Sequence, residues 1–254
     1  MLSVTMLPML NKKEIQILRD IAPVHKAVFE EIKKVAKPWV DGLFINELAG
    51  ALCKKWWVLP AFKWVYGFPA NICISINDVV VHGVPLKKAF HEGDVIKFDF
   101  GVKDKKVGVN TDAAFTMIIG DWPHHAKVEK FLEVNKHALK LWVREAVAGN
   151  RTGDIWHAIQ TYVEKHGFHI VKELTWHGIG KTLHEKPYVY NYGKKWVGDL
   201  LEKWMVIAIE PIIWFSSGRI FDMWGWEIYI KDGSYGSQFE HTILITDGEP
   251  EIII

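Results

Sequence analysis

The chain has 254 residues, 49% of them hydrophobic, which is enough to bury a sizeable core, and we expect residues 1–254 to form a single domain. Thirty-one basic residues against 30 acidic ones leave a formal net charge of +1, so no long-range field favours nucleic acid or an anionic membrane as a partner. The two cysteines, Cys53 and Cys73, are too few for a disulfide framework and fit a reducing cytoplasm.

The first residues, MLSVTMLPMLNKKEIQ, are briefly apolar, but they contain Pro8 and lack both a basic leader and a small-residue cleavage pattern. We therefore do not expect a secretory signal. No run approaches the roughly 18 apolar residues of a membrane span, so we expect a soluble protein.

The amino-terminal elements begin with a capping box, because Asn11 is followed three residues later by Glu14. Apolar residues then recur at helical spacing, with a candidate bend at Pro23. The segments expected here are helices over residues 12–36 and 45–55 and a strand over residues 70–76.

The remaining elements start with two apolar runs separated by a polar stretch, which predicts a hairpin. Two helices follow, and Gly167 supplies the stop signal of the second. The expected segments are hairpin strands 95–102 and 113–119, helices 124–148 and 154–166, and strands 168–173, 205–210, 226–231 and 240–246.

Two stretches share one layout, because a long helix, a shorter helix and a strand are expected near residues 12–76 and again near 124–174. The repeat is either a weak internal duplication or a coincidence in a protein with several helices. A duplication favours an α+β architecture of two halves with a site between them.

Acidic residues interrupt several apolar strands. Asp99 lies in VIKFDFG, where a buried carboxylate is costly unless a cation or backbone donors compensate its charge. Asp112, in NTDAAFT, begins the return strand of the same hairpin, so the two carboxylates can approach each other. A pair of facing carboxylates favours a metal over backbone donors.

Three more candidate ligands follow the same pattern. Glu210 ends VIAIEP, Glu240 lies in QFEHTILIT, and His177 lies in WHGIGKTLHE, seven residues before His184. Four carboxylates and one neutral imidazole balance two divalent cations, and this donor set suits Mn, Fe, Co or Zn. Two such ions can share a water, lower its pKa and stabilise an oxyanion.

The segments GFPANICISINDVVVHGVP, EGDVIKFDFG, TDAAFTMIIG, HGIGKTLHEKP, AIEP and QFEHTILIT resemble, in this order, those of type I methionine aminopeptidases of the pita-bread fold. The resemblance covers nearly the whole chain. It implies two pseudo-symmetric halves around a central antiparallel sheet. It also implies a metal-ligand set, with Asp112 and Glu240 bridging, that comprises Asp99, Asp112, His177, Glu210 and Glu240.

The same resemblance assigns roles near the substrate. His82 contacts the substrate and stabilises the transition state, His184 hydrogen-bonds the peptide carbonyl, and Glu210 assists proton transfer. The alternative for both histidines is an ordinary structural role. The methionine pocket maps onto apolar positions that would otherwise be assigned to the core, namely Phe68, Cys73, Leu183 and Trp226.

The sequence departs from the family in two ways. The hairpin between Asp99 and Asp112 is two residues longer, and an even change keeps each side chain on its face, so we prefer Asp112 to Asn110 as the ligand. Several of the 13 tryptophans stand where the family has glycine, and the clearest are Trp39, Trp64, Trp156, Trp176 and Trp204.

Tryptophan replaces glycine poorly at turns that need a positive φ or a close approach. We hypothesise that UGA codons at these positions are read as glycine in the source organism, whereas Trp226 is genuine. The alternative is a tryptophan-rich variant with adapted turns. If the residues are truly tryptophan, Trp64 and Trp176 are candidates to block substrate or impair folding.

The interpretation is a monomeric cytoplasmic enzyme that removes the initiator methionine from nascent polypeptides, at the ribosome or away from it. It needs no contact with nucleic acid or membrane. The rivals are an Xaa-Pro aminopeptidase or dipeptidase of the same fold, whose members usually carry an extra amino-terminal domain, and an inactive binding relative.

Overall fold

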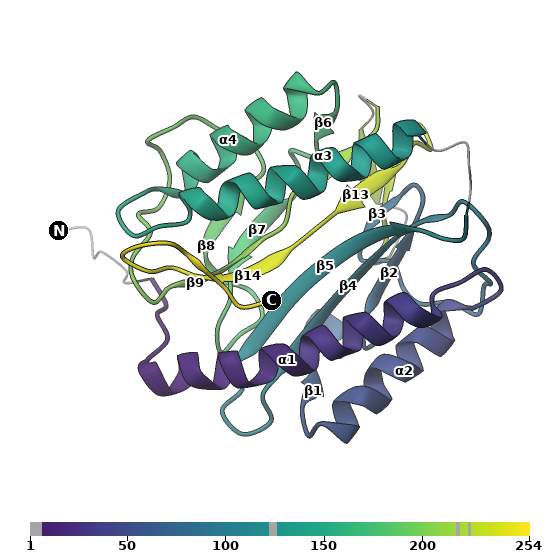
Figure 1. Cartoon of the computed structure of the whole chain (residues 1–254), viewed down its shortest axis with the longest axis horizontal. Coiled ribbons are helices and arrows are strands. Elements are labelled where there is room, and N and C mark those ends of the chain that lie inside the picture. Colours follow the sequence, from purple (N-terminus) through teal and green to yellow (C-terminus); the bar gives the residue numbers. More distant parts are fainter. Residues whose placement is uncertain (1–6, 122–125, 217–218, 223–224) are drawn as a thin grey trace.

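The computed structural model describes residues 7–121, 126–216, 219–222 and 225–254. Its helices lie in two pairs on opposite sides of the strands (Figure 1). One pair is α1 (Lys12–Val35) with α2 (Gly42–Lys55), and the other is α3 (Ala126–Trp142) with α4 (Thr152–Lys165). Short 3-10 helices are η1 (Val65–Gly67) and η2 (Val143–Glu145).

The described strands form four antiparallel sheets, and their orders are β1-β4-β2 with β5 on β4, β15-β14-β9-β7-β8, β13-β10-β6 and β11-β12-β3. Their bounds are β1 (Leu59–Pro60), β2 (Cys73–Ile76), β3 (Val79–Val81), β4 (Val95–Lys103), β5 (Asn110–Ile118), β6 (His169–Ile170), β7 (Thr175–Gly178), β8 (Glu185–Tyr190), β9 (Val206–Ile209), β10 (Ile212–Trp214), β11 (Ile220–Asp222), β12 (Ile228–Ile230), β13 (Gly236–Gln238), β14 (His241–Leu244) and β15 (Glu251–Ile252). The α+β class is therefore confirmed.

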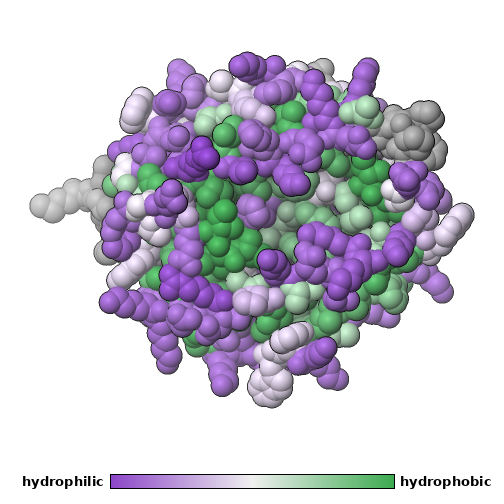
Figure 2. Space-filling model, viewed as in Figure 1, coloured by the Kyte–Doolittle hydropathy of each residue, from purple (hydrophilic) through white to green (hydrophobic). Residues whose placement is uncertain are grey.

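Each helix pair covers its own set of strands. One buried cluster, which includes Ile32 and Ile45, fills the space between α1, α2 and the β4–β5 hairpin. A second cluster, which includes Ile159 and Ile207, lies between α3, α4 and the strands β7, β9 and β14. In the face shown in Figure 2, hydrophobic residues gather between α1 and α3, and hydrophilic side chains surround them. The two halves are therefore packed around separate cores.

Side chains of β5 and its neighbours join the halves. Thr242 Oγ1 accepts from Asp112 N at 2.8 Å and donates to Asp112 O at 2.6 Å. Thr116 Oγ1 likewise accepts from Gln238 N at 3.0 Å and donates to Gln238 O at 2.6 Å. These buried hydrogen bonds fix β5 against β13 and β14, where strands of both halves meet.

Several predicted helix and strand boundaries differ from those in the structure, whereas two predicted helix end signals are present. The Asn11–Glu14 capping box is present, and Gly167, with a φ of +82°, follows α4 as the stop signal predicts. The predicted helix 124–148 ends earlier, at Trp142, and residues 124 and 125 lie outside the described part. The predicted strands 70–76 and 168–173 shorten to Cys73–Ile76 and His169–Ile170.

The tryptophans divide into two groups by backbone conformation. Among the described residues, five tryptophans have a left-handed φ of 62–73°, which is a conformational outlier for so bulky a side chain: Trp39, Trp57, Trp64, Trp196 and Trp204. The turn geometry that glycine favours is thus present at three of the five hypothesised positions. It is absent from Trp156 and Trp176, which lie in α4 and β7.

The two exceptions are buried in the core of the carboxy-terminal half. Trp176 is fully buried, stacks on Trp142 with ring centroids 5.5 Å apart, and donates from Nε1 to Asn191 Oδ1 at 2.7 Å. For Trp156 and Trp176 the prediction of a glycine-like turn is therefore wrong, because a helix and a strand keep φ negative.

Candidate metal centre

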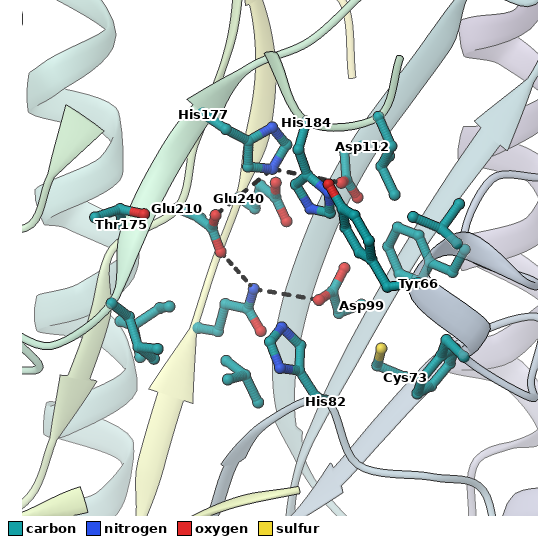
Figure 3. A pocket seen from close by; sticks show the side chains of 18 of the residues that line it. Tyr66, Cys73, His82, Asp99, Asp112, Thr175, His177, His184, Glu210 and Glu240 are labelled. Carbon is teal, nitrogen blue, oxygen red and sulfur yellow. Dashed lines mark hydrogen bonds and ion pairs between the residues drawn. The ribbon is translucent and has the colours of Figure 1, made fainter. Parts of the chain in front are cut away.

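Two of the predicted acids come from the β4–β5 hairpin. Asp99 lies in the middle of β4, and Asp112 in β5 pairs with Gly101. Because alternate residues of a strand share a face, Asp99 and Asp112 point to the same side of the hairpin. Phe98 and Phe100 point to the other side, into the core beneath α1 and α2. The two carboxylates therefore share one side of the hairpin (Figure 3).

The other three candidates come from the carboxy-terminal half. His177 lies in β7, Glu210 directly follows β9, and Glu240 lies between β13 and β14. Glu240 N donates to Ala114 O at 2.9 Å, next to the link between β5 and β14. The seam between the halves therefore carries ligand candidates from both.

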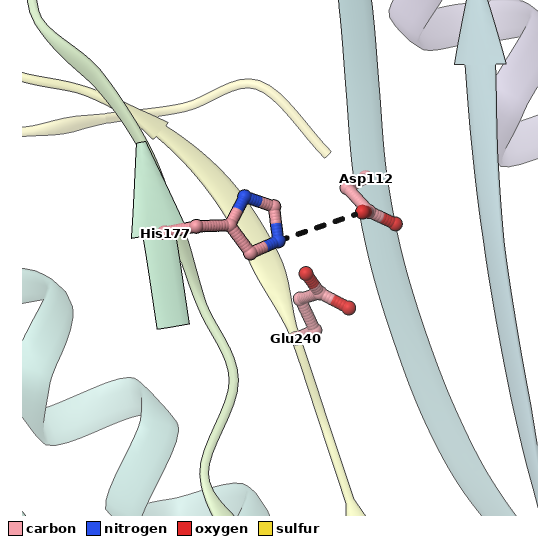
Figure 4. A group of neighbouring side chains, drawn as sticks. All are labelled: Asp112, His177 and Glu240. Carbon is pink, nitrogen blue, oxygen red and sulfur yellow. Dashed lines mark ion pairs between the residues drawn. The ribbon is translucent and has the colours of Figure 1, made fainter. Parts of the chain in front are cut away.

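Side-chain distances bring these groups into one cluster. His177 Nε2 lies 3.9 Å from Asp112 Oδ2 and 3.8 Å from Glu210 Oε1. One donor atom from each of Asp112, His177 and Glu240 lies within 4.8 Å of the others (Figure 4). All three are buried. The three groups could therefore hold a shared cation.

Gln238 connects the remaining acid to the cluster. Its Nε2 donates to Glu210 Oε2 at 3.0 Å and to Asp99 Oδ2 at 3.4 Å. The amide thereby spans the two halves and orients one carboxylate of each. All five predicted ligands therefore line one buried site.

The buried carboxylates need a compensating charge. Burial raises the pKa of Asp99 to about 7. Burial, and then repulsion by neighbouring carboxylates, raises the pKa values of Asp112, Glu210 and Glu240 well above their usual range. No lysine or arginine of the described residues forms an ion pair with these four acids. Divalent cations would remove the repulsion.

The donor atoms fit such cations. Asp99 Oδ1 and Asp112 Oδ1 are buried and have no hydrogen-bond partner in the described part of the chain. Burial, and then the neighbouring His184, lowers the pKa of His177 to about 3, so its imidazole is neutral. His177 Nδ1 lies 2.9 Å from Gly178 O and can donate to it, which leaves Nε2 as a ligand.

A cavity of about 380 Å³ opens onto these groups. The predicted methionine-pocket residues all line it, and two of them, Phe68 and Trp226, form an edge-to-face pair with centroids 5.5 Å apart. Neither Trp64 nor Trp176 is among its described lining residues, so neither side chain blocks this pocket. An apolar compartment therefore adjoins the polar centre.

The two predicted histidines also line the cavity. His82 is held at a φ of +60°, and burial, then repulsion by His184, lowers its pKa to about 4. Burial also lowers the pKa of His184, whose ring lies edge-to-face on His177 with centroids 4.4 Å apart. Both imidazoles are neutral at physiological pH and can each donate one hydrogen bond.

The sequence analysis did not predict every residue of the site, and Gln238 and Tyr66 are two that it missed. Gln238 lies two positions before Glu240, and the alternation of a strand was a signal that could have indicated it. Tyr66 lies on η1 at the cavity, and no sequence pattern indicates its position.

Residues 16–247 match the family model described as Metallopeptidase family M24. The chain is 39% identical over 245 residues to the methionine aminopeptidase of Clostridium acetobutylicum, covering 96% of each chain. It matches the crystal structure of the methionine aminopeptidase from Thermotoga maritima with a TM-score of 0.92 and 35% identity, covering 98% of this chain and 99% of that one. Prolidase from Pyrococcus furiosus shares the fold alone, with a TM-score of 0.76 and 21% identity, and this chain covers 64% of it.

Proposed function

Because this chain belongs to metallopeptidase family M24, we propose that it removes the amino-terminal methionine from polypeptides, using two divalent ions. It is a metallo-aminopeptidase of the pita-bread fold, as the motifs imply. One catalytic domain carries the activity. The residues that would hold the ions are Asp99, Asp112, His177, Glu210 and Glu240.

The observation that supports this proposal best is the convergence of five buried ligand candidates beside an apolar cavity. When bound, a pair of divalent ions supplies a water of lowered pKa and polarises a carbonyl. Mn, Fe, Co and Zn all suit a set of four carboxylates and one imidazole.

The protein's own residues bind and orient the substrate. The apolar wall formed by Phe68, Cys73, Leu183 and Trp226 accepts the methionine side chain, since a flexible thioether fits an irregular apolar space. The cavity therefore places the first peptide bond next to the carboxylates.

Proton transfer and hydrogen bonding fall to three residues. The Glu210 carboxylate, oriented by Gln238, takes the proton of the attacking water and delivers it to the leaving amine. His82 and His184 donate hydrogen bonds to the substrate, because each is a neutral imidazole facing the cavity. His82 stabilises the transition state, and His184 binds the peptide carbonyl.

The substrates are nascent chains with a small second residue, in the cytoplasm, and the enzyme acts as a monomer at the ribosome or after release. No described helix combines the length and apolar character that a membrane span requires. The presence of all five ligands with His82 and His184 argues against an inactive relative.

The test compares the cleavage of two peptides by the metal-free protein and by the protein reconstituted with metal. Metal-free protein is supplied with Mn, Fe, Co or Zn and given Met-Ala-Ser or an Xaa-Pro peptide. We expect release of methionine from Met-Ala-Ser alone, and loss of this release in Glu210→Ala and His82→Ala. Preferential cleavage of Xaa-Pro would show the rival specificity, and full activity of either variant would overturn its assigned role.

A further inference from the structure

The rim of the cavity contains an aromatic contact between the two halves of the fold. Tyr66 lies on η1 in the amino-terminal half, and His184 precedes β8 in the carboxy-terminal half. Their rings are stacked, with centroids 5.6 Å apart and planes 20° from parallel (Figure 3). Both residues line the cavity.

Burial does not explain the position of Tyr66. Its side chain is 77% exposed, and its backbone adopts the left-handed values of φ 50° and ψ 19°. Such a conformation is strained for a bulky residue and is typical of sites where structure serves function. The hydrogen bonds Trp64 N to Phe68 O, 2.8 Å, and Phe68 N to Val65 O, 2.9 Å, hold the segment in this shape.

His184 depends on ring contacts for its orientation. Its Nδ1 is buried and has no hydrogen-bond partner among the described residues. Instead, the imidazole lies between Tyr66, which stacks on one face, and His177, which meets it at 71°. Without an acceptor at Nδ1 to fix the ring plane, these two rings set it.

We propose that Tyr66 is a positioning residue that holds the imidazole of His184 in the orientation needed to hydrogen-bond the substrate. This role rests on the proposed aminopeptidase function. Tyr66 acts through the π-face of its ring, so its hydroxyl group is dispensable. Loss of the ring lets the imidazole rotate and lowers kcat more than it raises KM, because the oriented hydrogen bond strengthens as the carbonyl gains negative charge.

The test measures kcat and KM for Met-Ala-Ser in the manganese-loaded full chain. Tyr66→Phe keeps the ring and should match the unmodified protein. Tyr66→Leu should lower kcat/KM by roughly two- to tenfold, the fold-change expected for one aromatic pair. The matched control is Tyr192→Ala, because Tyr192 is also an exposed, ring-packed tyrosine but does not line the cavity.

A second comparison separates positioning from general stability. In a His184→Ala background, Tyr66→Leu should cause no further fall in kcat/KM. The single variant Tyr66→Leu should have the same unfolding midpoint and the same manganese affinity as the unmodified chain. Multiplicative losses in the double variant, or equal losses in Tyr66→Phe and Tyr66→Leu, would overturn the proposal. If Tyr66→Leu has the same kcat/KM as the unmodified chain, this inference alone is refuted. If the unmodified chain shows no turnover, the proposed function is refuted as well.

Discussion

Replacing the left-handed tryptophans by glycine should stabilise the protein. Trp39, Trp57, Trp64 and Trp196 have φ values of 62–73° and side chains that are 69–82% exposed. They therefore carry backbone strain with little compensating burial. This combination is what the hypothesis of UGA codons read as glycine predicts for turns that evolved around glycine.

The magnitude follows from two opposing contributions. A left-handed conformation costs an L-residue about 1–2 kcal/mol, whereas glycine adds an entropic cost of about 0.5–1 kcal/mol on folding. The net gain is about 1 kcal/mol at each site, and about 4 kcal/mol for the four together where they are far enough apart to add. Trp57 should gain least, because Lys105 Nζ lies 4.4 Å from its ring centroid.

The assay is denaturant unfolding of each variant, with thermal unfolding as a check. A gain of about 1 kcal/mol raises the unfolding temperature of a protein this size by roughly 2–4 °C. Trp39→Ala isolates the cause, because alanine removes the exposed ring but keeps the left-handed strain. Trp56→Gly is the matched control, since Trp56 is 50% exposed but has a φ of −97°.

The reasoning would be refuted if alanine and glycine stabilised position 39 equally, or if Trp56→Gly stabilised as much as the four substitutions. The hypothesis also predicts higher activity when glycine replaces the three originally identified tryptophans that have a left-handed φ, which are Trp39, Trp64 and Trp204. The gene sequence tests it independently, because codons other than UGA at the left-handed positions would contradict it.

Three further predictions concern buried polar side chains, two of them at the site and one, Lys97, elsewhere in β4. Gln238→Met should weaken manganese binding by roughly tenfold to a hundredfold, because methionine cannot donate the hydrogen bonds that orient the Asp99 and Glu210 carboxylates. Calorimetry that shows an unchanged affinity would contradict this. With EDTA present, the unmodified protein should lose stability relative to Asp99→Asn as the pH rises from about 4 to about 7, since the folded state holds a proton on Asp99 that the unfolded chain releases. The comparison cancels the opposite contribution of the buried histidines, and a constant difference in thermal unfolding across this range would contradict it. Lys97→Met should raise the free energy of unfolding below pH 7, because burial lowers the Lys97 pKa from 10.5 to about 7 and so makes the charged lysine costly in the fold. This gain over the unmodified protein should shrink as the pH rises from 7 towards 10.5, and a gain that stays constant across this range would count against the prediction.

The sequence predicted the ligand set because a carboxylate in an apolar strand is a conspicuous exception. Asp99 and Asp112 were expected to approach each other across one hairpin, and the structure brings them into one site. The convergence of Glu210 and Glu240 with them depends on pairing between the halves, which no local pattern encodes. The family resemblance supplied that information.

Other features could not be predicted for physical reasons. The three-residue strands β3, β10 and β13 are too short to show a periodicity. The left-handed conformations of Trp57 and Trp196 are properties of the folded backbone, and the stacking of Tyr66 on His184 joins residues far apart in the chain. The turns expected at Trp156 and Trp176 were wrong, because a family glycine at a position does not show that the position is a turn.

The most direct test of the metal centre is the anomalous X-ray scattering of crystals grown from metal-free protein and soaked in Mn²⁺. Two manganese peaks should appear in the cavity, both within coordination distance of the Asp112 and Glu240 carboxylates, with His177 among the ligands. A crystal that takes up no manganese there, or binds it only outside this group of side chains, would contradict the proposed dinuclear centre.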